Sequence, residues 1–178
     1  TGNCLTRLAA DGGWCKHSVP PRLKPGVRPS QIGRPVADIL QDFPIQVPPH
    51  RVFEGVSQPA MLDQWWTLRS SGQPLVGSVY ELDFGPNYLW HAVVTVAQPG
   101  AAFELRLVDA DRDWTNTIVG FDLTASGTGT IVRFRHLGWP EPNEHYRTSC
   151  HCWALYLRIL RRHLEVGEAV PYDRRLDV

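Results

Sequence analysis

A cluster of cysteine and histidine stands out among the residues whose types could do chemistry. Cys150, His151 and Cys152 are consecutive, between Ser149 and Trp153. A thiol beside an imidazole is typical of a nucleophilic or redox pair, and the three side chains could also supply part of a metal site. On a helix, however, neighbouring side chains point about 100 degrees apart, so they do not share a face. The sequence therefore favours structural packing of Cys150, and we expect no metal and no cofactor.

His136 is a second candidate for proton chemistry, because the alternation of a strand places it on an inward face. An imidazole has an ordinary pKa of about 6.5, so it could act as a general base or as the hydrogen-bond partner of a ligand. Tyr146, at the start of the last predicted helix, could direct its hydroxyl toward the same end of the interior. A packed core histidine and a core tyrosine are the alternative, and the sequence leaves both open.

Two further motifs carry weaker signals. The pair Trp65-Trp66 could cover a pocket or contact a partner, and adjacent helical positions predict that one ring is core and the other lies at the rim. Asp109, Asp111 and Asp113 alternate like calcium ligands, but the segment lacks the glycine and the glutamate of a calcium loop. A solvated turn is expected there. Phosphate loops, dinucleotide fingerprints and the Ser-His-Asp order are absent from the sequence.

The composition limits the class of protein that holds these residues. The chain has 178 residues, of which 43% are hydrophobic and 20% charged, with seven Trp. That length suits one domain with a real core. No apolar run is long enough for a membrane span and no signal-peptide pattern occurs, so we expect a soluble, cytoplasmic protein. The four cysteines are spaced neither like a zinc knuckle nor like a disulfide framework.

Charge is unevenly distributed along the chain. Residues 1–35 carry six Arg or Lys against one Asp, together with five prolines and no alternating apolar pattern. We interpret this range as a basic, Pro-rich tail that is disordered or foreign to the native protein. The remainder is mildly acidic, so no nucleic-acid surface is expected on it. The predicted organisation is the tail, a folded domain over 36–168 and a C-terminal tail over 169–178.

The apolar patterns predict which elements hold the candidate residues. Residues 39–47 are expected to form a first strand, with Leu40 among its apolar side chains. Two short helices follow over 51–56 and 59–66, and a loop is expected at 70–72. Alternating apolar and polar residues then predict about five further strands, which form an antiparallel sheet with one apolar face.

One long amphipathic helix is predicted over residues 144–165. Apolar side chains recur there at helical spacing, Asn143 suits the N-cap, and Gly167 lies near the expected end. An antiparallel meander cannot bury its apolar face alone, so this helix must lie across the sheet. The predicted fold class is therefore α+β, of the helix-grip kind, with a curved antiparallel sheet wrapped around a long C-terminal helix.

Several short motifs stand in order between about Ile39 and Gly167, namely Pro48-Pro49-His50-Arg51-Val52-Phe53, Trp65-Trp66, Phe84-Gly85, Phe121-Asp122-Leu123, His136-Leu137-Gly138-Trp139 and Trp153-Ala154-Leu155-Tyr156-Leu157. With this order and spacing the chain resembles the START-like (SRPBCC) superfamily, which has the birch-pollen-allergen fold and includes polyketide cyclases and lipid-transfer domains. More narrowly, it is similar to the branch related to the activator of the heat-shock-protein-ninety ATPase. Many members of that branch have no assigned function, so the resemblance implies the fold more than the chemistry.

The resemblance implies a cavity between the concave face of the sheet and the final helix. Such a lining is apolar with a few polar tips, and it suits a small hydrophobic or aromatic ligand oriented by one or two hydrogen bonds. The expected ligand-binding residues are the pair Trp65 and Trp66, as a lid, and those selected by strand parity and helical spacing, which are Tyr80, Phe84, Trp90, Phe103, Phe121, Phe134, His136, Tyr146, Cys150, Trp153 and Leu157.

Three functions remain open at this level. The first expectation is binding of a small hydrophobic ligand, a lipid or a polyketide among others, without catalysis. The second is a cyclase-like or dehydratase-like enzyme that uses His136 and Tyr146 as its proton-handling pair. The third, implied by the resemblance alone, is an ATPase-activator-like interaction module with a chaperone partner. The sequence does not set the oligomeric state.

Overall fold

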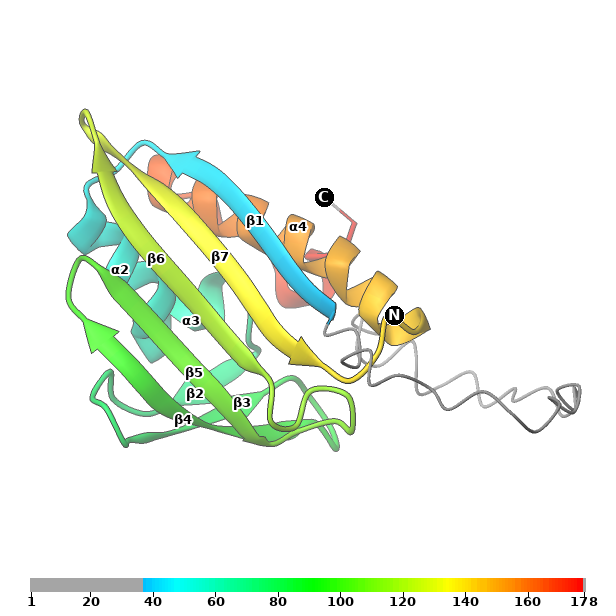
Figure 1. Ribbon diagram of the computed structural model, residues 1–178. Helices are drawn as coiled ribbons and strands as arrows, with labels where there is room; N and C mark the ends of the chain where they lie inside the picture. The colour runs from blue at the N-terminus through cyan, green and yellow to red at the C-terminus, as the bar shows by residue number, and fades with distance from the viewer. Residues whose placement is uncertain (1–36, 178) are drawn as a thin grey trace, which may run out of the picture.

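The computed structural model describes residues 37–177, which form a seven-stranded antiparallel sheet wrapped around a long helix (Figure 1). The predicted α+β helix-grip fold is confirmed, whereas the range 1–35, predicted as a basic tail, lies outside the described residues. The helices are α2 (Pro49–Ser57), α3 (Pro59–Trp65), α4 (Glu144–Val166) and the short 3-10 helix η1 (Tyr172–Arg174). The strands are β1 (Ala37–Ile45), β2 (Arg69–Ser71), β3 (Val79–Asp83), β4 (Leu89–Gln98), β5 (Ala102–Asp109), β6 (Ile118–Ser126) and β7 (Gly129–Trp139).

The path of the chain explains the order of the strands, which is β1-β7-β6-β5-β4-β3-β2. Strands β3 to β7 follow one another as antiparallel neighbours, and β1 pairs with the last of them, so that Ile45 lies opposite Thr130. The helices α2 and α3 contact both the sheet and α4. All three helices therefore cover the same face of the sheet, and the core lies between them and the strands (Figure 1).

The long helix α4 begins and ends as the sequence predicts. The side chain of Asn143 accepts a hydrogen bond from the backbone N–H of Tyr146 (2.9 Å), which caps the first turn. Gly167 follows the last turn in the left-handed conformation (φ 71°), which glycine adopts without strain. Trp153 and Leu157 are on the buried face of the helix. This face covers the concave side of the sheet.

The tryptophan pair at the end of α3 differs from its prediction. Trp65 and Trp66 are both buried, 0% and 2% exposed, and their rings stack with centroids 5.9 Å apart. The helix α3 ends at Trp65, and Trp66 has a non-helical backbone (φ −120°, ψ −65°). The rotation that separates neighbours on a helix therefore does not apply between them. Both side chains enter the core, and neither is a rim residue.

Two details of the strands differ from the sequence pattern. Leu40, one of the apolar side chains of the predicted first strand, is 67% exposed. The buried positions of β1 are Ile39 and Ile45, which have the opposite parity to Leu40 and so point to the other face. The loop expected at 70–72 overlaps β2, which pairs with β3 so that Ser70 lies opposite Leu82. An edge strand of three residues is too short to show an alternating pattern.

The segment after α4 is packed on the domain, although it was expected to be a tail. Arg175 is 5% exposed, and its guanidinium donates to the backbone carbonyls of Thr67 (2.9 Å) and Asp63 (2.6 Å). The hydroxyl of Tyr172 donates to the backbone carbonyl of Phe84 (2.8 Å). These bonds hold η1 against the end of α3. Within residues 37–177, no helix is both long and apolar enough to cross a membrane.

Candidate functional site

The side chains expected to line a cavity form the aromatic core of the domain. Strand parity and helical spacing place them on the inner face, and all of them except Tyr146 and Cys150 are buried. They also contact one another. The ring of Trp153 has its centroid 5.2 Å from that of Trp66 and 4.5 Å from that of Phe134. Apart from Tyr146, Cys150 and the Trp65-Trp66 pair, these side chains point inward as predicted, while the role of the whole set in ligand binding stays a prediction.

His136 lies within this core, and both of its ring nitrogens are hydrogen-bonded. Trp153 contributes its indole N–H to Nδ1 (3.0 Å), and an indole nitrogen can only donate. Nε2 therefore carries the hydrogen of the imidazole and donates it to the hydroxyl of Thr117 (2.9 Å). That hydroxyl donates in turn to the backbone carbonyl of Trp114 (2.5 Å). The neutral imidazole has one ring lone pair, on Nδ1, and the hydrogen bond from Trp153 occupies it.

The environment of His136 keeps the imidazole neutral. Burial lowers its pKa from the ordinary 6.5 to about 3, and the nearby His145 acts in the same direction. A protonated ring would present a second N–H to the indole N–H of Trp153, and the bond to Nδ1 would be lost. At neutral pH the imidazole therefore links β7 to α4 as a structural hydrogen-bonding group.

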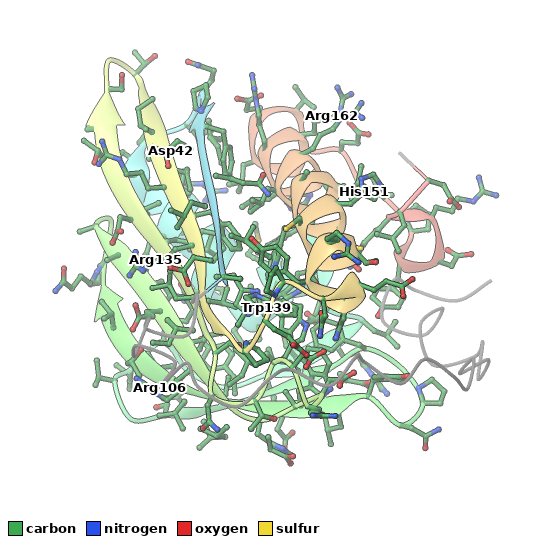
Figure 2. All side chains as sticks on the ribbon, turned by 45° about the vertical axis from the view of Figure 1, so that its right-hand side comes forward. Asp42, Arg106, Arg135, Trp139, His151 and Arg162 are labelled. Carbon is green, nitrogen blue, oxygen red and sulfur yellow. The ribbon has the colours of Figure 1, made fainter. Side chains whose placement is uncertain are left out.

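Tyr146 and Cys150, in the first turns of α4, are less buried than the imidazole of His136. The hydroxyl of Tyr146 donates to the backbone carbonyl of Asp38 at the edge of the sheet (2.9 Å), and Cys150 is a half-buried free thiol. Burial and the neighbouring Cys150 raise the pKa of Tyr146. His151 is exposed on the outer side of the helix (Figure 2). The polar tips of His136 and Tyr146 are therefore bonded to different partners, although both rings contact the ring of Trp139.

Two tryptophans outside the predicted lining lie beside His136. The ring centroids of Trp114 and Trp139 are 4.4 and 4.9 Å from the imidazole and 5.7 Å from each other. Both indole N–H groups are buried, and neither has an acceptor among residues 37–177. Trp139 lies between the sheet and the start of α4 (Figure 2). Buried donors without a partner are uncommon in folded proteins, so this pair is a candidate position for an acceptor.

The sequence carries only weak signals for these two residues. In the strand pattern that ends at Trp139, His136 is the last residue predicted to point inward. Trp114 follows a predicted turn and belongs to no alternating segment. The number of tryptophans was the one hint, because seven large indoles require a large aromatic interior.

A polar cluster lies next to the two indoles, at the surface. Asp113, in the segment between β5 and β6, accepts hydrogen bonds from Nδ2 of Asn143 (3.0 Å) and Nδ1 of His145 (3.2 Å). These partners belong to the cap and the first turn of α4, so the carboxylate joins that turn to the segment that carries Trp114. The side chain of Asp113, expected in a solvated turn, is only 18% exposed. No group of three or more His, Cys, Asp or Glu in the described part of the chain is placed to hold a metal ion.

A groove lies elsewhere, between the edge strand β1 and α4. Its volume is about 190 Å³, and Leu157 is the residue that it shares with the predicted lining. Arg158 and Arg161 contribute positive charge, and Arg161 is paired with Glu165 (3.2 Å). The remaining lining residues are Gln41, Asp42, Phe43 and Ala154.

Comparison with known proteins places this architecture in a family. The profile described as Activator of Hsp90 ATPase homolog 1-like protein matches residues 46–165. Among solved structures, the chain is similar to the Aha1 dimer from Colwellia psychrerythraea, with 25% identity, a TM-score of 0.68, and coverage of 75% of this chain and 99% of that one. No curated protein matches the chain.

Two structures of lower identity share the fold alone. DynU16, a protein in the dynemicin biosynthetic locus, is 20% identical with a TM-score of 0.63, and the match covers 74% of this chain and 48% of that one. CalU16 from Micromonospora echinospora is 15% identical with a TM-score of 0.62, and the match covers 80% of this chain and 83% of that one. With a profile match that spans most of the helix-grip domain, the chain belongs to the family of Activator of Hsp90 ATPase homolog 1-like proteins, within the START-like superfamily.

Proposed function

We propose that the domain binds a small aromatic or otherwise hydrophobic ligand that carries a hydrogen-bond acceptor, where Trp114 and Trp139 meet the start of α4. The observation that carries this proposal is the pair of buried indole N–H groups without an acceptor among residues 37–177. A buried donor left without a partner costs about 1–3 kcal/mol. An acceptor on the ligand removes that cost when it binds, so the free domain is prepared for such a group.

The surroundings of the two indoles support an aromatic ligand. Trp114 contacts the rings of Trp90 and Trp153, at centroid distances of 5.0 and 5.8 Å, and Trp139 contacts the ring of Tyr146 at 5.5 Å. Flat rings contribute a large apolar contact area, and edge-to-face and offset-stacked arrangements add to the attraction. A ligand that enters here is held by burial and oriented by the two N–H groups.

Binding is better supported than catalysis by the pair His136 and Tyr146. The lone pair of the buried imidazole accepts from Trp153, and the tyrosine hydroxyl is bonded to the carbonyl of Asp38. A general base needs a free lone pair within reach of the proton that it abstracts. The arrangement of these two side chains thus favours a structural role for the imidazole over the cyclase-like alternative.

The proposal is tested with a panel of lipids, polyketides and aromatic acids, by thermal shift and native mass spectrometry. We expect at least one aromatic compound with a carbonyl or carboxylate group to bind. Trp139→Phe should then weaken binding several-fold, because the hydrogen bond is lost while most of the ring remains. Trp65→Phe is the matched control, since the indole of Trp65 donates to the carbonyl of Gly55 (2.9 Å) in another part of the core. Absence of binding across the panel, or equal affinity of wild type and Trp139→Phe, contradicts the proposal.

Family membership favours a second function, which is interaction with a chaperone ATPase. The matching profile is named for activators of Hsp90 ATPase, and the similar structure from Colwellia psychrerythraea is a dimer of Aha1. We infer that the domain binds the middle domain of such a chaperone. A pull-down with that middle domain and a measurement of the chaperone's ATPase rate test this inference. If the domain is not enriched and the rate does not change, the inference is contradicted. The cytoplasmic location stays a prediction.

A further inference from the structure

We propose that Asp113 and His145 form a second recognition element of this site, in which the imidazole accepts a hydrogen bond from a hydroxyl group of the ligand. The inference rests on the proposed function, because the same ligand places its acceptor on the indoles of Trp114 and Trp139. It assigns the ligand to aromatic acids or ketones that also carry a hydroxyl group.

The first step is the tautomer of His145. Its Nδ1 lies 3.2 Å from Oδ2 of Asp113, and a carboxylate can only accept. Nδ1 therefore carries the hydrogen, and in the neutral ring Nε2 has the lone pair. Asn143 donates to the same carboxylate oxygen (3.0 Å) and holds it in place. Nε2 forms no hydrogen bond with another residue in the range 37–177, and the His145 side chain is 14% exposed. An oriented acceptor is thus present at the surface of the site.

The second step is the position of this acceptor relative to the indoles. The ring of His145 meets that of Trp139 edge to face, with centroids 5.5 Å apart at an interplanar angle of 89°. Trp139 contacts Trp114 in turn at 5.7 Å, and Trp114 follows Asp113 directly in the chain. The rings that carry this acceptor and the two donors are therefore consecutive neighbours, with centroids about one aromatic ring apart. Asp113 is a positioning residue, because it acts through the imidazole.

This arrangement predicts the chemistry of the ligand. The N–H groups of Trp114 and Trp139 require an acceptor on the ligand, a carbonyl or a carboxylate. The Nε2 of His145 requires a donor, and a hydroxyl on the same ring places a donor about one ring width away. A compound that lacks the hydroxyl leaves the imidazole acceptor without its bond, and such a loss typically lowers affinity about tenfold.

The test uses three matched probes, namely 3-hydroxybenzoate, benzoate and 3-methoxybenzoate, which differ in whether they offer a hydroxyl donor. Affinities are measured by calorimetry and by the shift of the Trp139 indole N–H signal in NMR spectra. We expect 3-hydroxybenzoate to bind about tenfold more tightly than the other two. His145→Phe should bring the affinities for 3-hydroxybenzoate and benzoate to about the same value, and its circular dichroism spectrum checks that the variant is folded.

The control comes from a similar pair on another surface. His91 and Asp109 are joined by a contact of 3.1 Å, on β4 and β5. His91→Phe should leave the preference for the hydroxyl unchanged. In Asp113→Asn, NMR spectra of the imidazole nitrogens should show a loss of the Nδ1–H tautomer of His145, together with a reduced preference. If Asp113 had only a structural role, Asp113→Asn would leave the tautomer of His145 unchanged.

The outcomes separate the two proposals. If benzoate and 3-hydroxybenzoate bind wild type equally, or if His145→Phe keeps the preference for the hydroxyl, the inference is overturned and ligand binding stands. If all three probes fail while other aromatic acids bind at Trp139, the assigned ligand class is overturned and the binding site stands. If no aromatic acid binds at all, the proposed function fails and the inference fails with it.

Discussion

Lowering the pH from 7 to 5 should destabilise the folded domain through His136. The unfolded chain takes up a proton on this residue near the ordinary pKa of 6.5, whereas burial lowers the pKa in the folded domain to about 3. Between these two values the unfolded state binds more protons than the folded state. The contribution of the neutral imidazole is therefore complete above pH 6.5 and is lost progressively as the pH falls toward 3.

The magnitude follows from the size of the shift. Each pH unit inside this window lowers the free energy of unfolding by about 1.4 kcal/mol. Integrated from pH 7 to pH 5, the loss is about 2 kcal/mol, because the first half unit lies above the unfolded pKa. The variant His136→Gln keeps an acceptor for Trp153 and a donor for Thr117 but has no titratable group, so this part of the loss should disappear.

Urea denaturation at pH 7, 6 and 5, followed by circular dichroism, measures both proteins under the same conditions. The carboxylates and the other histidines contribute equally to wild type and variant, so the difference between the two pH profiles isolates His136. We expect that difference to shrink by about 2 kcal/mol between pH 7 and pH 5. Parallel profiles would refute the reasoning, because they would mean that the imidazole protonates equally in the folded and unfolded states.

Three further predictions concern stability at neutral pH. Trp153→Phe removes a hydrogen-bonded indole N–H, whereas Trp114→Phe removes one without a partner. Trp153→Phe should therefore lower the free energy of unfolding by about 1 kcal/mol more than Trp114→Phe. Equal losses would argue against the bond between Trp153 and the imidazole. Gly120→Ala places a methyl group 2.8 Å from Cζ of Arg135 and should lower the free energy of unfolding by about 1 kcal/mol. In the background of Arg135→Ala this loss should be smaller, because the clash is gone. Strictly additive losses in the double variant would show that the two sites do not interact. Arg175→Met leaves two backbone carbonyls near the end of α3 without their donor and should cost about 2 kcal/mol, with faster hydrogen exchange in η1 as the second readout. Unchanged exchange there would mean that the segment is held by other contacts.

The architecture could be predicted from the sequence because its signals are local. Alternating residues select the faces of the longer strands, and apolar residues at helical spacing select the buried face of α4. The cap at Asn143 and the glycine at 167 depend on the backbone within one turn, so they too are visible in the sequence. Such signals fail at Leu40, whose parity differs from that of its apolar neighbours, at the three-residue strand β2, and at Trp66, where the helix has ended.

The candidate site depends on contacts that no local pattern encodes. Asp113 and His145 are 32 residues apart, and only the packing of α4 against the end of the sheet brings them together. The same packing decides that His136 has both nitrogens engaged and that the indoles of Trp114 and Trp139 have no acceptor among residues 37–177. The sequence by itself determined which side chains of the longer strands and of α4 point inward, because direction follows from the period of a strand or a helix. The tertiary structure decided which donors and acceptors meet, because a hydrogen bond requires two groups from different elements within about 3 Å.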